Sequence, residues 1–125
     1  FHGRFVELAP CYAWPKPVQQ PRVRTLIGGG ASARLFAAIA EYADGWMPIG
    51  GSGLRVGLPA LRAAVAAVGR DPGALHVVPF GTVPDDGKLE HFADLGVTEV
   101  VLRLPSGTDA TMLRTLDAFC RYLSD

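Results

Sequence analysis

The residues of this chain best suited to binding chemistry are three consecutive glycines followed, two positions later, by a serine. The segment Gly28-Gly29-Gly30-Ala31-Ser32 comes directly after the short apolar run Thr25-Leu26-Ile27. Glycine lets the backbone turn sharply and approach a ligand closely, and serine is a favoured N-cap for a following helix. Exposed amides at a helix N-terminus attract phosphate, and the helix dipole adds to this attraction. We therefore expect Gly28, Gly29, Gly30, Ala31 and Ser32 to form a phosphate-binding turn.

An ordinary connection between a strand and a helix uses the same residue types. The segment contains neither the GxGxxG nor the GxxxxGKS pattern of the common nucleotide-binding loops. Both interpretations predict the same local structure, so the glycine turn alone does not decide between them.

Strand and helix patterns alternate four times after residue 24. Short apolar runs predict strands near residues 25–28, 46–49, 75–80 and 99–104, and an amphipathic helical pattern follows each of them. Regular alternation of this kind predicts an α/β fold with a parallel sheet covered by helices. We expect residues 1–125 to form one unit, in which residues 25–125 supply four βα units.

The helices are predicted from their apolar stripes and their terminating residues. The first carries Phe36 and Ile39 after the cap at Ser32, and the second ends at Gly69 after a loop over residues 49–57. The last runs from about residue 109 to 123. Prolines at positions 10, 15, 17 and 21 predict that residues 1–24 form an extended lead-in, with a short strand at residues 4–8.

Ligands of parallel α/β folds bind at the carboxyl ends of the strands. This rule gathers the glycine turn, residues 46–48, residues 80–82 and residues 103–106 around one site. These stretches contain no carboxylate pair, no metal-ligand cluster and no nucleophile with a neighbouring base. The pattern favours holding a cofactor over acid–base catalysis, and it identifies no catalytic residue and no metal ligand.

Composition excludes several classes of function. The 12 basic and 12 acidic side chains give a net charge of zero without a Lys/Arg cluster, so a nucleic-acid partner is not expected. The apolar stretches are shorter than the roughly 20 residues that a membrane span needs, and the N-terminus does not have the order of a signal peptide. These features predict a cytoplasmic protein. Cys11 and Cys120 are then expected to be reduced, with Cys120 packed in the apolar stripe of the last helix.

Five short motifs follow one another along the chain: Phe1-x-Gly3-Arg4-Phe5, Pro15-Lys16-Pro17-Val18-Gln19, Leu26-Ile27-Gly28-Gly29, Tyr42-Ala43-Asp44-Gly45-Trp46 and Gly69-Arg70-Asp71-Pro72. In their order and spacing they resemble the C-terminal half of the luciferase-like monooxygenase family, and the resemblance covers nearly the entire chain. The closest resemblance is to the actinobacterial branch that uses the deazaflavin coenzyme F420 in place of FMN.

The resemblance implies a (β/α)₈ TIM barrel of which this chain supplies strands five to eight. A complete barrel needs about 250 residues, twice the 125 present here. The parent would be an F420- or FMN-dependent oxidoreductase or monooxygenase, with F420 favoured, acting on a small-molecule substrate. The segment would be inactive alone, because the family carries much of its ring pocket and its catalytic residues on strands one to four. The open half-barrel would favour a homodimer.

The resemblance also assigns roles to individual residues. The glycine turn and Ser32 would hold the phosphate of the cofactor, and Trp46 and Met47 would border the substrate. As large apolar residues, Trp46 and Met47 are equally consistent with core packing. Arg103 would contact an anionic substrate or the cofactor tail, although an arginine at a strand end is commonly just solvated.

Two other functions agree with the same residues. One is a non-catalytic α/β half-barrel that binds a phosphorylated ligand or a partner chain. The other is a doubly wound phosphosugar-binding enzyme, against which the absence of an acid–base pair argues.

Overall fold

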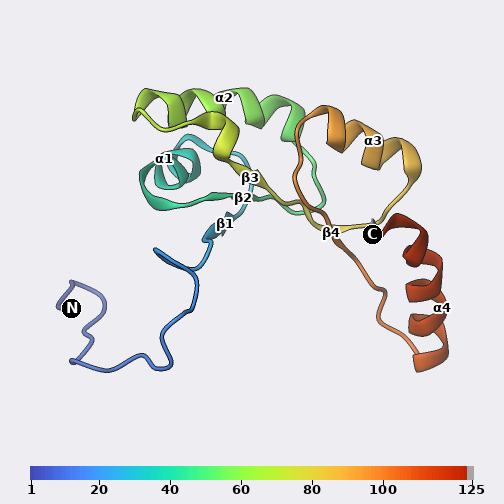
Figure 1. Ribbon diagram of the computed structural model, residues 1–125, viewed down its shortest axis with the longest axis horizontal. Helices are drawn as coiled ribbons and strands as arrows, with labels where there is room; N and C mark the ends of the chain where they lie inside the picture. Colours follow the sequence, from blue (N-terminus) through green and yellow to red (C-terminus); the bar gives the residue numbers. More distant parts are fainter. Residues whose placement is uncertain (124–125) are drawn as a thin grey trace.

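Strands and helices alternate along the chain in the computed structural model, which describes residues 1–123 (Figure 1). The strands are β1 (Leu26–Gly28), β2 (Gly45–Met47), β3 (His76–Val77), β4 (Phe80–Thr82) and β5 (Val101–Leu102). The helices are α1 (Ala33–Tyr42), α2 (Leu54–Ala67), α3 (Asp86–Asp94) and α4 (Asp109–Phe119), with 3₁₀ turns η1 (Pro72–Ala74) and η2 (Cys120–Tyr122). The predicted mixed α/β class is therefore confirmed.

The strands pair in parallel and in chain order. One sheet has the order β1-β2-β3 and a second pairs β4 with β5. An isolated parallel bridge between Ile49 and Phe80, with the Gly50 amide donating to the Phe80 carbonyl at 2.7 Å, carries the pairing on from the first sheet to the second. A doubly wound sheet reverses its strand order at a switch point, and the described strands show no such reversal.

The sheet has one face packed against helices. Ile27, Trp46 and Val77 lie in register on β1, β2 and β3 and belong to the main apolar cluster or pack against it. Helices α1 and α2 cover them, and the cluster contains Phe36, Ile39, Ala40, Ala43, Trp46, Leu54, Leu58, Leu61, Val65, Leu75, Val77 and Phe92. Because side chains alternate along a strand, the neighbours of these residues point to the opposite face of the sheet.

Helix α2 begins earlier than the sequence pattern predicts. The expected loop over residues 49–57 ends at Gly53, and Leu54 already opens the helix although Gly57 and Pro59 lie inside it. Leu54, Leu58 and Leu61 are fully buried at helical spacing. Burial of this stripe outweighs the cost of a glycine and a proline in the first turns.

Three further expectations need correction. Residues 4–8 do not form a strand, and only an isolated antiparallel bridge joins His2 to Glu7. The expected strand at residues 75–80 is divided into β3 and β4 opposite Pro48, which follows β2 and has no N–H to donate to the Val78 carbonyl. The last helix ends at Phe119, and Cys120 is exposed rather than packed, because no residue of α4 is buried against another element.

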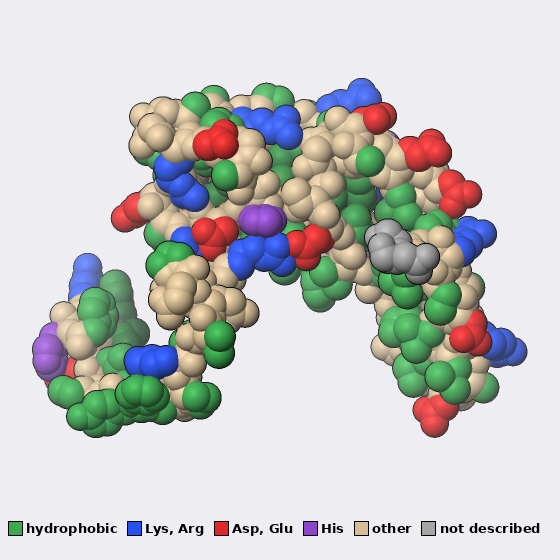
Figure 2. All heavy atoms as spheres, in the orientation of Figure 1, with side chains coloured by type: hydrophobic (Ala, Val, Ile, Leu, Met, Phe, Trp, Pro, Cys, Tyr) green, Lys and Arg blue, Asp and Glu red, His purple; other side chains and the backbone are tan. Residues whose placement is uncertain are grey.

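Residues 1–24 contain no helix and extend away from the sheet (Figure 1). Their large apolar side chains are exposed and form the hydrophobic surface visible over this segment in Figure 2; they include Phe1, Phe5, Leu8, Tyr12, Trp14 and Val18. Among the helices within residues 1–123, none combines the length and apolar character that crossing a bilayer requires.

Candidate functional site

The glycine turn follows β1 directly. Gly29 has a φ of 139°, a region that residues with a side chain rarely adopt, and a Cβ there would lie 2.9 Å from Leu35 Cδ1. Its amide donates to the Met47 carbonyl at 3.4 Å, which ties the start of the turn to β2. The backbone therefore needs glycine at this position for its conformation.

Ser32 caps α1, as the sequence predicts. It has extended backbone angles, its Oγ accepts the Leu35 amide at 3.3 Å, and its carbonyl accepts the Phe36 amide at 3.0 Å. Within residues 1–123, no acceptor is recorded for the amides of Gly30, Ala31, Ser32, Ala33 and Arg34, all of which are exposed residues. These amides at the positive end of a ten-residue helix form a geometry that suits an anion.

Trp46 lies beneath the turn, on the helix-covered side of the sheet. It has no exposed surface, and its Nε1–H donates to the Gly29 carbonyl at 2.9 Å. Its ring meets Phe36 edge to face, with centroids 5.3 Å apart and an angle of 81° between the planes. Trp46 thus contacts the glycine turn from the core.

Met47 and Arg103 lie on the other side of the sheet or at its edge. By strand alternation Met47 faces away from α1 and α2, and it is partly exposed. Arg103 follows β5 and lines a cavity of about 400 Å³ with Ile49, Phe80, Gly81, Leu102 and Leu104. It also lines a neighbouring cavity of about 600 Å³ with Val83, Pro105, Ser106, Thr115 and Phe119. The structure therefore brings Arg103 together with Ile49 and Phe80, and separates it from Trp46.

Ile49, Phe80 and Val101 form an exposed apolar row, of which the sequence analysis assigned only Phe80 to the site. The register places them side by side on the face opposite the helices, and they are 74%, 50% and 38% exposed. Ile49 was expected at the end of the strand near residues 46–49, where the expected loop over residues 49–57 begins. The available signal was its place two residues after Met47, which continues the strand alternation.

Charged residues gather at the opposite, amino ends of the strands. Arg22 forms a two-pronged ion pair with Asp44, at 2.7 and 2.8 Å, and also donates to the Tyr42 carbonyl. Arg24 pairs with Glu99 and lies 3.2 Å from His76 Nδ1. Figure 2 shows basic, acidic and histidine side chains together in the middle of this view. These pairs join segments that precede β1, β2, β3 and β5, which indicates a stabilising role.

Two carboxyl groups in this cluster have lowered pKa values. The amide of Thr25, which donates to Asp44 at 2.6 Å, and the guanidinium of Arg22 hold the pKa of Asp44 below its ordinary value. The hydrogen bond from Arg24 lowers the pKa of Glu99. Both carboxylates are therefore charged at neutral pH and are unsuited to donate a proton there.

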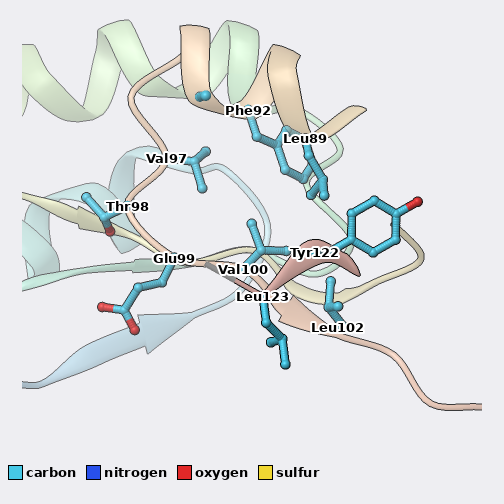
Figure 3. A pocket seen from close by; sticks show the side chains of 10 residues that line it. Leu89, Phe92, Val97, Thr98, Glu99, Val100, Leu102, Tyr122 and Leu123 are labelled. Carbon is cyan, nitrogen blue, oxygen red and sulfur yellow. The ribbon is translucent and has the colours of Figure 1, made fainter. Parts of the chain in front are cut away.

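A third cavity, of about 470 Å³, lies between α3, β5 and η2 (Figure 3). Its walls are mostly apolar side chains such as Leu89, Phe92 and Val97, and in Figure 3 Glu99 points away from them. It presents no convergent set of polar groups, so it resembles a packing groove more than a catalytic pocket. Within residues 1–123, no group of three or more His, Cys, Asp or Glu side chains is arranged to hold a metal ion.

Comparison with known proteins identifies the family of the chain. Residues 1–84, which contain the glycine turn, α1, β2, α2 and β3, match the luciferase-like monooxygenase family. The chain is 38% identical over 106 residues to the uncharacterized protein Rv0953c of Mycobacterium tuberculosis and to the uncharacterized protein Mb0978c of Mycobacterium bovis. The aligned part is 84% of this chain and 37% of each relative, so the chain spans little more than a third of their length. No solved structure matches it significantly. The family match covers well over half of the sequence, and the chain belongs to the luciferase-like monooxygenase family.

Proposed function

We propose that this chain holds the phosphate of a flavin or deazaflavin cofactor in an oxidoreductase of the luciferase-like type. One observation carries the proposal: the amides of residues 30–34, which have no recorded acceptor within residues 1–123, lie at the N-terminus of α1, at the carboxyl end of a parallel strand and inside the segment that matches the family. A parallel α/β fold places its ligand at this end of the sheet.

The residues of the turn fit a phosphate by charge and by shape. The site offers hydrogen-bond donors and the positive end of a helix, and it holds no carboxylate that would repel an anion. Ser32 uses its Oγ as an acceptor for the Leu35 amide, which leaves its hydroxyl proton free to donate. Arg34, in the first turn of α1, adds a positive charge close to the same amides.

The cofactor favoured by the family resemblance is F420, with FMN as the alternative. When bound, F420 supplies hydride transfer and reduced FMN supplies oxygen activation. The chain's own part is to fix the phosphate and thereby to orient the ring toward the open face of the sheet.

We assign the substrate side of the site to the open face. Met47, Ile49 and Phe80 provide an apolar wall there, and Arg103 provides a cation at its border. Such a wall excludes water from a reacting ring, and the cation suits a substrate or cofactor tail with an anionic group. Trp46 contributes from the core, through its contact with Gly29.

We further propose that the open face is the interior of a (β/α)₈ barrel. Parallel strands in chain order, with α1 and α2 on one side and exposed apolar side chains on the other, are what four consecutive units of such a barrel present. The remaining units would cover Ile49, Phe80 and Val101. Left uncovered, this row favours association with a second copy.

Separate titrations of F420 and FMN into the full-length protein test the proposed function. We expect one of them to bind with a dissociation constant in the micromolar range or below, and to bind more tightly than inorganic phosphate. Binding of neither cofactor would contradict the proposal. Equal affinity for FMN and for simple phosphate esters would instead favour a non-catalytic module that binds phosphorylated ligands.

A further inference from the structure

We infer that Trp46 is a positioning residue, whose indole N–H fixes the Gly29–Gly30 peptide so that the Gly30 amide faces the cofactor phosphate. The inference rests on the proposed function, and it assigns a task to a residue that touches neither the phosphate nor the ring. It starts from the hydrogen bond of 2.9 Å between Trp46 Nε1 and the Gly29 carbonyl oxygen.

The direction of the Gly30 amide follows from the planarity of the peptide bond. In a trans peptide the carbonyl oxygen and the amide hydrogen of the next residue point in opposite directions. The Gly29 carbonyl points at the buried indole, so the Gly30 N–H points away from the core. Gly30 is exposed and its amide has no recorded acceptor within residues 1–123, which leaves it free for an anion.

The turn needs such a constraint because of its own composition. Three successive glycines have access to many backbone conformations, and a rotation of the Gly29–Gly30 peptide would turn the carbonyl oxygen toward the phosphate in place of the amide. A carbonyl oxygen in that position would repel the anion. The indole prevents this rotation because a buried N–H without an acceptor is costly, and the Gly29 oxygen is its recorded partner.

The indole is itself held firmly. Phe36 meets its face edge-on, and α2 approaches it so closely at Gly57 that a Cβ there would lie 3.0 Å from Trp46 Cη2 and 3.2 Å from Ala31 Cβ. Gly57 therefore leaves room for both Trp46 and Ala31 next to α2. Because the indole is held in place, the Gly30 amide has a fixed direction before a ligand binds. Less conformational entropy is then lost on binding.

The test compares FMN with riboflavin, which differ by the phosphate, or F420 with its phosphate-free chromophore if F420 is the ligand. In the full-length protein, Trp46→Phe keeps an aromatic ring in the core but removes the N–H. We expect the variant to lose about tenfold in affinity for the phosphorylated ligand, and to bind the phosphate-free one as the wild type does. The NMR signal of the Gly30 amide in glycine-labelled, ligand-free protein should shift, because the Gly29–Gly30 peptide is no longer held in one orientation.

Two controls separate positioning from general stability. Val65→Ala removes a buried side chain of α2 that takes no part in holding the indole, and it should lower stability without changing the affinity ratio of the two ligands. Trp14→Phe alters the other tryptophan, which is 71% exposed, and should change neither quantity. If Trp46→Phe fails to fold, replacing Trp46 by its benzothiophene analogue keeps the shape of the indole without the N–H.

Each outcome decides a different claim. An unchanged affinity ratio and an unchanged Gly30 signal in Trp46→Phe would overturn the inference while leaving the proposed function intact. An equal loss of the ratio in Val65→Ala would also overturn it, because the effect would then follow from lowered stability. A wild type that does not prefer FMN to riboflavin, or F420 to its chromophore, would overturn the proposed function and this inference with it.

Discussion

Trp46 donates its indole N–H to the carbonyl oxygen of Gly29 across 2.9 Å, and this bond joins the buried core to the glycine turn of the candidate site. The two residues lie on neighbouring parallel strands or their extensions, seventeen positions apart in the sequence. The glycine turn is therefore held by a hydrogen bond from β2 as well as by its connection to α1. Its conformation depends on the packing of the whole βαβ unit.

Arg70 is expected to be a major stabiliser of that unit. Its guanidinium donates to the carbonyls of Ile39, Ala40 and Ala43 at 2.8, 2.9 and 2.8 Å, which places a cation on the C-terminus of α1. Arg70→Met should lower the free energy of unfolding by about 2 kcal/mol. Arg70→Lys should lower it by about 1 kcal/mol, because lysine keeps the charge but lacks the planar set of N–H donors of the guanidinium. Urea denaturation measures both. The exposed Arg55→Met should stay within about 0.5 kcal/mol of wild type, and equal effects at the two positions would contradict the capping role.

Gly45 is required by the close approach of β2 and β3. A Cβ at this position would lie 2.0 Å from the His76 carbonyl oxygen, so the backbone of one strand would have to move. Gly45→Ala should cost about 3 kcal/mol or more in unfolding free energy. Gly87→Ala is the matched control, because Gly87 lies in α3 with room for a methyl group, and it should stabilise the protein by up to about 1 kcal/mol. A tolerated Gly45→Ala would show that the two strands are farther apart than described here.

Asp44 should make the free energy of unfolding depend on pH in the acid range. The Thr25 amide and Arg22 lower its pKa in the folded state. Its contribution to the free energy of unfolding is therefore complete above the ordinary aspartate pKa of about 3.9, and it disappears as the pH falls through the lower pKa of the folded state. Asp44→Ala should therefore lose about 1–2 kcal/mol at pH 7 and show a shallower loss of stability below about pH 4. Part of the slope should remain because Glu99 also has a lowered pKa.

Denaturation curves at a series of pH values measure this effect. The control is Asp94→Asn, an exposed carboxylate on α3 without a recorded ion pair in residues 1–123, which should leave the slope below pH 4 as it is in the wild type. The assignment to Asp44 is wrong if Asp44→Ala and the wild type lose stability in parallel between neutral and acid pH.

The exposed row of Ile49, Phe80 and Val101 should make this chain associate with itself when it is produced alone. Sedimentation equilibrium is expected to give a mass above the 13.3 kDa of one chain. The pair Ile49→Lys and Phe80→Lys should move the mass toward that value, because like charges on the open face repel a second copy. Val56→Lys, on the exposed side of α2, should have no such effect. A wild-type chain that sediments as a monomer would contradict an uncovered barrel interior.

The local features of the site were predictable from the sequence because each depends on a few neighbouring residues. Glycines after an apolar run predicted the turn, a serine before an amphipathic stretch predicted the cap, and both were confirmed around Ser32. The apolar stripe of α1 was predicted for the same reason, since Phe36, Ile39 and Ala40 are buried at helical spacing. These features set the position of the turn.

The faces of the short strands were not predictable, because a strand of three residues contains too few alternations to fix which side is buried. Trp46 and Met47 were expected to border the substrate together, yet adjacent residues of a strand point to opposite faces. The register of Trp46 with Ile27 and Val77, a relationship between distant segments, places Trp46 in the core. The early start of α2 depended in the same way on tertiary burial of Leu54 and Leu58.

The central claim is that the turn before α1 binds a phosphate, and two variants of Ser32 test it most directly in the full-length protein. Asparagine and aspartate both cap a helix as serine does, so Ser32→Asn and Ser32→Asp should both fold, but only aspartate places a negative charge beside the amides of residues 30–34. The measurement is the ratio of affinities for FMN and riboflavin, or for F420 and its phosphate-free chromophore, in each variant. We predict that Ser32→Asn keeps the preference for the phosphorylated ligand and that Ser32→Asp abolishes it. Equal ratios in the two variants would contradict a phosphate at this turn.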